Sequence, residues 1–443
     1  MPAKPTPFDV AAVRRKFPAL KQKIDGKAPV YLDNPGGTQV PQSVIDAMRD
    51  YLVTANSNHM GAFRTSILTD KTILDARSAM ADFLNAPSEK QIVFGQNMTT
   101  LTMHFSRSIG KTLTRGDEII LTKMDHDANV SPWLRIADDY GLRVRFAEWD
   151  TETGRLRLDW MAKLVTAKTK LIACGYASNA LGTINEVADV VRLAHEAGAL
   201  AYVDAVHFAP HGPIDVQALD CDFLVCSAYK FFGPHVSVLY GKTELLESLP
   251  AYKVRPAPDH IPERWETGTQ NHEGLAGVIA AIDYLTWVGE TQGTPYASQA
   301  KGYKGRRKSL KQAMIATKTY EQTLSRRLLD GLLSMEKVTV AGITEPDGMD
   351  ARTPTVVFNV QGKTPLDVAK TLGKQLIYVW DGNYYALEVM NTLGLEDKGG
   401  MVRVGAAHYN TAAEIDRFLE EVGKLVGIRA KPAKKPVRKA PAK

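Results

Sequence analysis

Short apolar runs that alternate with helical patterns constrain the fold of this chain more than any other feature. Helical patterns lie between several of these runs, for example Val187–Ala197, which ends before Gly198 as helices commonly end before a glycine. Buried strands with helical connections predict an α/β fold, with a mostly parallel sheet between helices. In such sheets, ligands bind at the carboxyl ends of the strands. Seven runs rich in apolar or β-branched residues predict the strands: Gln91–Phe94, Glu118–Thr122, Arg143–Ala147, Thr169–Cys174, Leu200–Val203, Phe223–Cys226 and Ser237–Tyr240.

The length of 443 residues exceeds a single compact core, so two domains are expected. Near residue 300 the pattern changes: Lys301–Lys311 is basic, and a long helical stretch follows to about Leu333. The rest predicts a smaller α+β domain, with strands at Lys337–Ala341, Thr355–Val360 and Met401–Gly405 and helices at Pro365–Gly373 and Thr411–Val426.

The domain boundaries follow from these changes of pattern. Residues 1–30, which include a predicted helix at Asp9–Leu20, form an N-terminal segment that packs with the small domain. Residues 31–295 form the large domain, and residues 296–428 form the small C-terminal domain. Residues 429–443 are a Pro/Ala/Lys-rich tail that we predict to be disordered.

The charge distribution argues against a nucleic-acid partner. The tail carries seven of the basic residues and no acidic one, so the net charge of +6 falls to −1 without it. A solvated tail is the ordinary explanation, and weak contact with a polyanion is the alternative. No run of eighteen apolar residues predicts a membrane span, and Met1–Pro5 lacks a signal-peptide core. Three cysteines in apolar runs (Cys174, Cys221 and Cys226) predict neither a disulfide framework nor a metal site, and we expect a cytoplasmic protein.

Four polar groups follow directly after predicted strands. They are Lys230, Asp204, His126 and the segment Asn97–Thr100. Each has an ordinary explanation when taken alone: a snorkelling lysine, a helix cap or loop aspartate, a loop histidine and a helix N-cap. Together they meet the four requirements of pyridoxal-5′-phosphate (PLP), which are a lysine for the Schiff base, an acid for the pyridine nitrogen, a phosphate cradle and a flat group over the ring.

Seven segments, in order along the chain, carry a family resemblance. Between about Asp9 and Val426 the chain closely resembles the class V aminotransferase family of PLP fold type I, and specifically its cysteine-desulfurase-like branch. The resemblance implies a PLP-dependent enzyme that acts on the α-amino group of a small-molecule L-amino acid. The matching segments are Tyr31–Gly37, Asp125–Trp133, Ser178–Thr183, Val203–His207, Ser227–Lys230, Glu266–Asn271 and Arg403–Gly405.

The resemblance also implies a role for each matching residue. Lys230 forms the Schiff base and later moves the α-proton, Asp204 pairs with the pyridine nitrogen, and His126 stacks on the ring. Asn179 lies near the substrate and the ring hydroxyl. Arg403 takes the substrate carboxylate as a bidentate pair, and a structural ion pair is its alternative role.

The remaining implied residues surround these. Thr99, Thr100 and Ser227 hold the phosphate, and Thr269 reaches it from the second subunit of a homodimer with shared active sites. Gly268 is a further cofactor-binding residue. Gly37 and Tyr385 belong to the substrate side.

Three positions depart from the pattern of the family. His207 stands where a glutamine usually lies beside the ring hydroxyl, and Tyr229 replaces the histidine before the lysine. Tyr385 occupies the position of the cysteine that accepts sulfur as a persulfide in true desulfurases. Trp380, Tyr384 and Tyr385 form either an aromatic wall of the site or ordinary packing.

The intact cofactor residues and the missing thiol lead to one hypothesis and two alternatives. We predict a C–S lyase or desulfinase that works without a protein persulfide. The first alternative is an enzyme of the same family that forms carbon–carbon bonds, epimerises or transaminates. The second, more remote, is a non-catalytic relative that binds partners through its tail.

Overall fold

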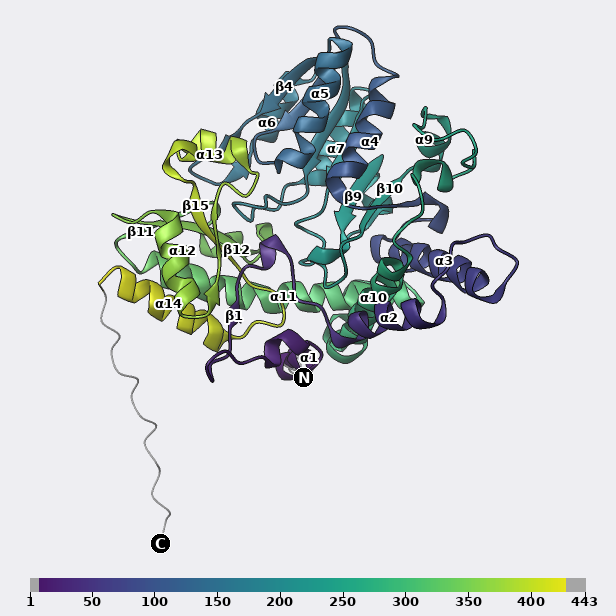
Figure 1. Cartoon of the computed structure of the whole chain (residues 1–443). Helices are drawn as coiled ribbons and strands as arrows, with labels where there is room; N and C mark the ends of the chain where they lie inside the picture. Colours follow the sequence, from purple (N-terminus) through teal and green to yellow (C-terminus); the bar gives the residue numbers. More distant parts are fainter. Residues whose placement is uncertain (1–7, 428–443) are drawn as a thin grey trace.

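Two larger β-sheets, of seven and four strands, are joined by one long helix (Figure 1), and two two-stranded sheets complete the sheets of the described part of the chain. The structure is a computed structural model that describes residues 8–427. The predicted tail at 429–443 therefore lies outside the described residues.

The larger sheet has seven strands in the order β2-β10-β9-β8-β7-β3-β4. All of its strands run parallel except β10, which pairs antiparallel with both neighbours. The predicted α/β fold with a mostly parallel seven-stranded sheet is confirmed. The bounds are β2 Ile92–Gly95, β3 Glu118–Thr122, β4 Arg143–Ala147, β7 Thr169–Gly175, β8 Leu200–Asp204, β9 Phe223–Ser227 and β10 Ser237–Gly241.

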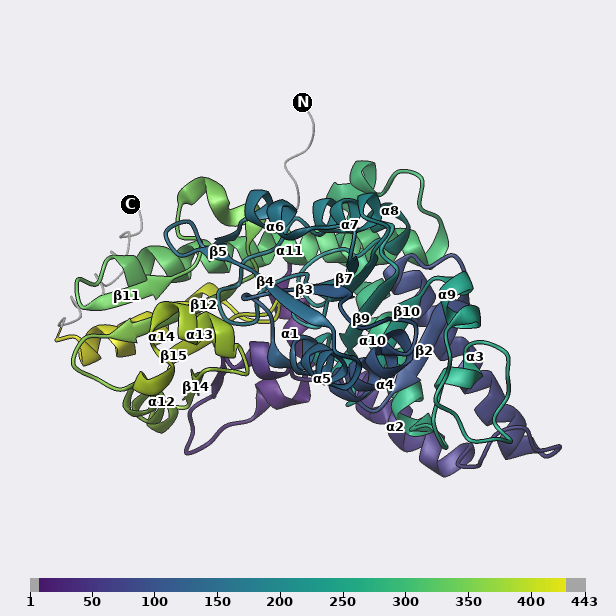
Figure 2. The ribbon, with the colours of Figure 1, turned by 90° about the horizontal axis from the view of Figure 1, so that it is seen from above.

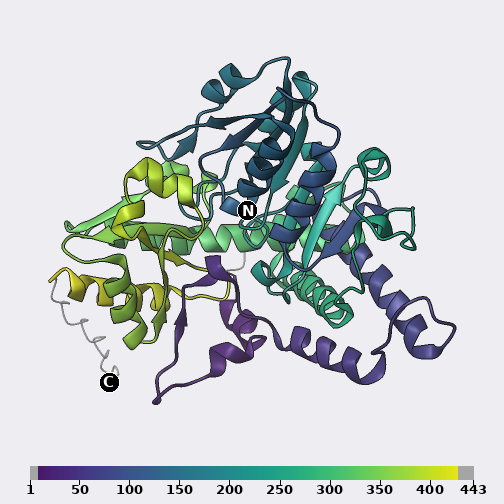
Figure 3. The ribbon, with the colours of Figure 1, turned by 45° about the horizontal axis from the view of Figure 1, so that its top comes forward.

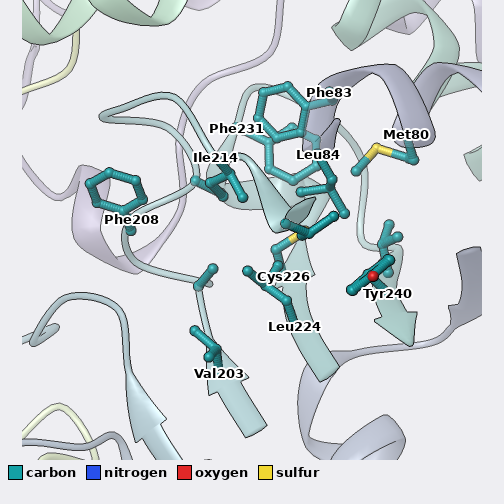
Figure 4. Close-up of a cluster of buried hydrophobic side chains, with 14 of the residues drawn as sticks. Met80, Phe83, Leu84, Val203, Phe208, Ile214, Leu224, Cys226, Phe231 and Tyr240 are labelled. Atoms are coloured by element: carbon teal, nitrogen blue, oxygen red, sulfur yellow. The ribbon is translucent and has the colours of Figure 1, made fainter. Parts of the chain in front are cut away.

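Helices cover both faces of this sheet (Figure 2). Leu121 and Val225 face a core that contains Phe105 of α4 and Trp133 of α5. The other face packs against α3, α7 and α10, and the close-up in Figure 4 shows Cys226 of β9 enclosed there among apolar side chains. The covering helices are α3 Arg64–Leu84, α4 Met98–Gly110, α5 Ser131–Tyr140, α7 Val187–Glu196 and α10 His272–Gln292.

The smaller sheet has four strands in the order β11-β12-β15-β14 and is antiparallel throughout. Its apolar face packs on α12 and α14 and on the second half of α11. The sequence missed the three-residue strand β14, which is too short to show periodicity. The bounds are β11 Val338–Ala341, β12 Thr355–Val360, β14 Trp380–Gly382, β15 Met401–Gly405, α12 Pro365–Lys374, α13 Leu387–Leu393 and α14 Ala412–Leu425.

The long helix α11, Gly305–Leu333, passes between the two halves (Figure 3). Met314 in its first half belongs to the core of the large sheet, whereas Leu324 and Leu328 belong to the core of the small sheet. The domain boundary near 295 remains a prediction, because this helix contributes to both cores.

The N-terminal segment contains less α-helix than predicted over Asp9–Leu20. Helix α1 covers Val10–Arg15 only, and a 3₁₀ turn begins at Pro18. Proline has no N–H group and its ring clashes with the preceding turn, so the helix cannot continue. Beyond the turn, β1 Val30–Tyr31 pairs parallel with β13 Ile377–Tyr378, next to the small sheet. The other elements are α2 Gln42–Thr54, β5 Trp149–Asp150, β6 Arg155–Leu156, α6 Leu158–Leu164, α8 Val216–Leu219 and α9 Thr243–Ser248.

Candidate active site

The carboxyl ends of the parallel strands open into a cavity of about 480 Å³. The small-sheet half closes it from the other side with residues 380–385 and with β15. The structure brings together there ten of the residues that the sequence indicated: Thr99, His126, Asn179, Asp204, His207, Ser227, Tyr229, Lys230, Tyr385 and Arg403.

Lys230 follows β9 in a 3₁₀ turn, and its ammonium group is enclosed by the cavity wall. Its Nζ donates to the carbonyl of Pro35, and no carboxylate among residues 8–427 pairs with it. Burial and the charge of Arg403 lower the pKa of Lys230 to about 7, against the opposing attraction of Asp204. A substantial fraction of this lysine is therefore a neutral amine at neutral pH, as a Schiff-base lysine requires.

Asp204 ends β8, and the carboxylate is buried at the floor of the cavity. Its Oδ1 accepts the backbone N–H of Val206 at 2.9 Å. Burial raises the pKa of Asp204 to about 6, while the Val206 bond and Lys230 act in the opposite direction. A buried acid in this range can share a proton with a basic ring nitrogen.

His126 lies just past β3, and its Nδ1 accepts the N–H of Ala128 at 3.0 Å. Burial, Lys230 and Arg403 lower the pKa of His126 to about 4, so the ring is neutral at pH 7. Below it, the carboxylate of Asp125 accepts hydrogen bonds from the side chains of Thr122 and Asn129 and from the N–H of Gly175, which fixes the ends of β3 and β7. The imidazole is a flat, uncharged and firmly held group.

The candidate phosphate residues are only partly assembled. Thr99 and Ser227 line the cavity, as does Tyr229, whose ring stacks on His235. Helix α4 begins beside Thr99 with Asn97 as its N-cap, so backbone N–H groups point toward the cavity. The hydroxyl of Thr100 instead donates to the carbonyl of Asn97 at 2.8 Å, and Thr100 does not line the cavity.

Three further predicted residues lie outside the cavity within this single chain. Gly37 lines a neighbouring cavity of about 470 Å³, which Tyr229 and Gly36 separate from the first. Gly268 and Thr269 are exposed on the segment before α10. Their assignment to the cofactor remains a prediction.

Arg403 projects from β15 into the cavity and has no ionic partner. Its Nη1 donates to the carbonyl of Asn179 at 2.9 Å, and its guanidinium lies 4.2 Å from the ring centre of Tyr384. No carboxylate within residues 8–427 forms an ion pair with it, and its Nε is buried without a partner, as is Oδ1 of Asn179. Burial lowers the pKa of Arg403 to about 10. An unpaired buried cation of this kind can receive a carboxylate.

His207 is enclosed between the two halves of the chain. Its Nε2 lies 3.0 Å from Oγ1 of Thr355 and 3.3 Å from Oγ1 of Thr353. Burial and the nearby cationic groups lower the pKa of His207 well below its usual range.

The loop at 381–387 presents aromatic side chains at the mouth of the cavity. Tyr385 is 70% exposed, and its ring stacks on His126 with 5.4 Å between ring centres. Tyr384 and Tyr385 both have left-handed backbone conformations, with φ angles of +55° and +59° respectively. The carbonyl of Tyr385 accepts the N–H of Asp127 at 2.7 Å, which ties the loop to the segment of His126.

The sequence did not identify several residues of the cavity wall, and only some of them carry a signal. Pro35 lies in the matching segment Tyr31–Gly37, but it acts through its backbone carbonyl, which its residue type does not reveal. Behind the wall, Thr353 and Thr355 contact Nε2 of His207 and lie in no matching segment. Asn97 was visible as an N-cap beside Thr99. Residues 8–427 contain no cluster of three metal-ligating side chains, and no helix within them is long and apolar enough to cross a membrane.

Comparison with known proteins places this site in a family. The profile of "Aminotransferase class-V" matches residues 30–307 and 290–418. The chain therefore belongs to the class V aminotransferase family, which consists of PLP-dependent enzymes of fold type I. It is a cysteine-desulfurase-like member of that family, and its cofactor is PLP.

Individual relatives agree with this classification. A cysteine desulfurase of Yersinia pseudotuberculosis is 32% identical over 439 residues, which cover 95% of this chain and all of the relative. The structure of a cysteine desulfurase from Thermococcus onnurineus matches with a TM-score of 0.82 at 29% identity, covering 94% of this chain and 98% of that one. The Escherichia coli cysteine desulfurase CsdA matches with a TM-score of 0.78 at 27% identity, covering 95% and 98%.

Proposed function

We propose that this enzyme releases sulfur from a cysteine-derived L-amino acid without forming a persulfide on the protein. The observation that carries the proposal is the position of its thiols. All three cysteines of the chain lie within the described residues, all are fully buried, and none lines the cavity.

Burial also makes these thiols unreactive. It raises the pKa of Cys221 to about 12 and raises the pKa values of Cys174 and Cys226 as well. The thiolate is the form that attacks sulfur, and it is scarce at neutral pH in such surroundings. At the position that the resemblance assigns to the persulfide cysteine, the mouth of the cavity presents the exposed side chain of Tyr385, and a phenol cannot carry a persulfide.

The cavity fits the cofactor, and each side chain has a proposed role there. Bound PLP supplies an electron sink that weakens the bonds at the α-carbon of an amino acid. Lys230 anchors the cofactor through Nζ and afterwards moves the α-proton, for which its lowered pKa suits it. Asp204 holds a proton at the ring nitrogen, and the neutral ring of His126 covers the face of the cofactor.

Substrate and phosphate are proposed to meet a second group of residues. The free edge of the Arg403 guanidinium takes the substrate carboxylate, and Asn179, held by the carbonyl of Tyr384, lies beside it. Thr99, Ser227 and the start of α4 receive the phosphate. Arg403 gives this end of the cavity the positive charge that the substrate carboxylate needs.

We further propose a homodimer in which active sites are shared. Exposed apolar side chains lie on α2, on α3 and on the loop between them, and we propose that they form one interface patch. That loop lies against the start of α10, where the rings of His59 and His272 are 6.0 Å apart, just after Gly268 and Thr269. These two residues would complete the phosphate site of the partner subunit. The patch consists of Ile45, Leu52, Val53, Met60, Phe63, Ile67 and Leu74.

The cytoplasm is the proposed location, and the three unpaired thiols are consistent with a reducing compartment.

A second function in the same family has one observation in its favour. Trp380, Tyr384 and Tyr385 line the cavity, so its mouth is aromatic and suits a bulkier amino acid or a carbon electrophile. Carbon–carbon bond formation, epimerisation or transamination would use the same cofactor residues.

A substrate panel separates these functions. L-cysteine, cysteine sulfinate, S-substituted cysteines and alanine are incubated with the holoenzyme, and released sulfur species, organic products and protein mass are measured. We expect either sulfide with pyruvate and ammonia from L-cysteine, or alanine with the sulfinate group released as sulfite from cysteine sulfinate, and no protein species heavier by one sulfur atom.

The matched control is a variant in which all three cysteines are replaced by alanine. We expect it to lose some stability through packing but to keep its rate within a few-fold. A sulfur adduct on a cysteine, or a folded, PLP-loaded and inactive cysteine-free variant, would contradict the proposal. Turnover of alanine without sulfur chemistry would favour the second function.

A further inference from the structure

The hydroxyl group of Thr355 occupies an unusual position, because its hydrogen-bond partner is a ring nitrogen in the wall of the cofactor cavity. Thr355 begins β12 and is fully buried. Its Oγ1 lies 3.0 Å from Nε2 of His207, and within residues 8–427 it has no other hydrogen-bond partner. The hydroxyl proton therefore has one available acceptor.

The neighbouring hydroxyl of Thr353 is already committed. It donates to the carbonyl of Gly182 at 3.2 Å, while its oxygen lies 3.3 Å from the same Nε2. Thr353 can therefore accept from the imidazole but cannot donate to it without losing the bond to Gly182.

Counting donors and acceptors decides between the two neutral forms of His207. If Nε2 carried the proton, it would face two oxygens, but the enclosed hydroxyl proton of Thr355 would have no acceptor, which is costly. If Nδ1 carries the proton, Nε2 accepts from Thr355, and only the Nδ1 proton is left for a partner outside the described side chains. The hydrogen bond at one ring nitrogen thus sets the state of the other.

The other nitrogen, Nδ1, faces the cavity. It has no hydrogen-bond partner among the described residues and is not fully enclosed, and His207 lines the cavity. The charged or titratable groups around the ring are Lys230, Arg403, His126 and His211, whose ring centre is 5.6 Å away. Burial above all, together with the charge of Arg403, keeps the imidazole neutral, so that a tautomer is defined.

We propose that Thr355 is a positioning residue that fixes His207 as its Nδ1–H tautomer and so presents an N–H donor to the cofactor. The inference rests on the proposed function insofar as this cavity holds PLP beside His207. A glutamine at this position could turn its amide to offer either a donor or an acceptor, whereas a histidine with a fixed tautomer offers only one. An N–H donor suits an anionic oxygen on the cofactor and favours its ionised form.

The tautomer can be measured directly. The holoenzyme is labelled with ¹⁵N in its histidine rings, and the signals of His207 are assigned by their loss in His207→Gln. We expect a protonated, pyrrole-type Nδ1 and an unprotonated, pyridine-type Nε2. In Thr355→Val the two signals should move toward the opposite form or toward a mixture, and in Thr355→Ser they should stay as in the wild type.

The consequence for the cofactor is read from its visible absorption band. Loss of an N–H donor to an anionic oxygen should move the pH midpoint of that band upward by about half a unit or more in Thr355→Val. The matched control is Thr353→Val, which removes an equally buried hydroxyl but leaves the donor to Nε2 in place, so its shift should be much smaller. In a His207→Gln background, Thr355→Val should no longer move the midpoint.

Three results would overturn the proposal. They are an unprotonated Nδ1 in the wild type, equal shifts for the two threonine variants, and a Thr355→Val shift that persists in His207→Gln. None of these readouts depends on turnover. The proposal about the tautomer of His207 can therefore be confirmed even if the substrate panel contradicts the proposed sulfur-releasing function, so the two proposals are tested independently.

Discussion

Replacing Arg403 by methionine should weaken substrate binding without a matching loss in the free energy of unfolding, and it does so more clearly than any other substitution in this site. The guanidinium is buried, makes one hydrogen bond to the carbonyl of Asn179 and has no ion-pair partner among residues 8–427. Its remaining N–H groups are proposed to receive the substrate carboxylate.

The expected loss in binding follows from that bond. A hydrogen bond to a charged group contributes about 1.5–3 kcal/mol, and each 1.36 kcal/mol corresponds to a tenfold change. We therefore expect Arg403→Met to raise KM by roughly 10- to 150-fold for any amino-acid substrate.

The free energy of unfolding should not show a matching loss. Burial without a counter-ion lowers the pKa of Arg403 to about 10, so the folded protein disfavours its charge. Arg403→Met removes this unfavourable charge but leaves the carbonyl of Asn179 without its donor, so the two effects should offset and the free energy of unfolding should change by no more than about 1 kcal/mol. If Arg403 were instead half of a structural ion pair, its loss would cost about 3–5 kcal/mol.

Arg352 provides the matched control. It is also buried, and burial likewise lowers the pKa of Arg352 to about 10, but it donates to the carbonyls of Ile343, Thr353 and Thr355 and does not line the cavity. Arg352→Met should lower the free energy of unfolding by more than about 2 kcal/mol, because it leaves buried carbonyls without donors.

The assay combines steady-state kinetics with urea unfolding at one fixed concentration of free PLP, since a cofactor that binds the folded state adds stability. A loss of several kcal/mol in Arg403→Met with an unchanged KM would refute the substrate role.

The other predictions concern the anchor and the dimer. Lys230→Ala should abolish covalent PLP labelling by borohydride, and a persisting label would mean that the anchor lies elsewhere. In the cofactor-free protein the pKa of Lys230 is about 7 when folded and about 10.4 when unfolded, so between these values the unfolded chain binds the extra proton. Between about pH 7 and about pH 10.4 the free energy of unfolding should therefore rise with pH, by up to about 1.4 kcal/mol per pH unit relative to Lys230→Met. Equal pH profiles for the two proteins would contradict the lowered pKa of Lys230. Val53→Asp should dissociate the dimer at micromolar concentration and lower PLP occupancy, as gel filtration and absorbance would show; a wild-type monomer with full PLP occupancy would contradict the shared site.

Local patterns were sufficient for much of the fold. The seven strands of the large sheet begin and end within one residue of their predicted bounds, because six of them are largely buried and therefore read as apolar runs, while the partly exposed edge strand β4 alternates arginine with Val144 and Phe146. The same patterns placed Lys230, Asp204 and His126 after strand ends, and parallel strands bring such residues to one edge. The three-residue strand β14 and the break before Pro18 depend on too few residues to appear as periodicity.

Only the tertiary structure could decide which groups lack partners and which ones face each other. Sequence allowed Arg403 to be a structural ion-pair residue, whereas in the structure no carboxylate of residues 8–427 lies within ion-pair distance of it, and Asp33 is close enough only to raise its pKa against the effect of burial. Sequence showed three cysteines, but their enclosure on one side of the sheet makes the thiols inaccessible. Thr355 lies 148 residues from His207, and no motif links them. Charge and proton positions depend on burial and on neighbours across the fold, and a linear pattern does not carry that information.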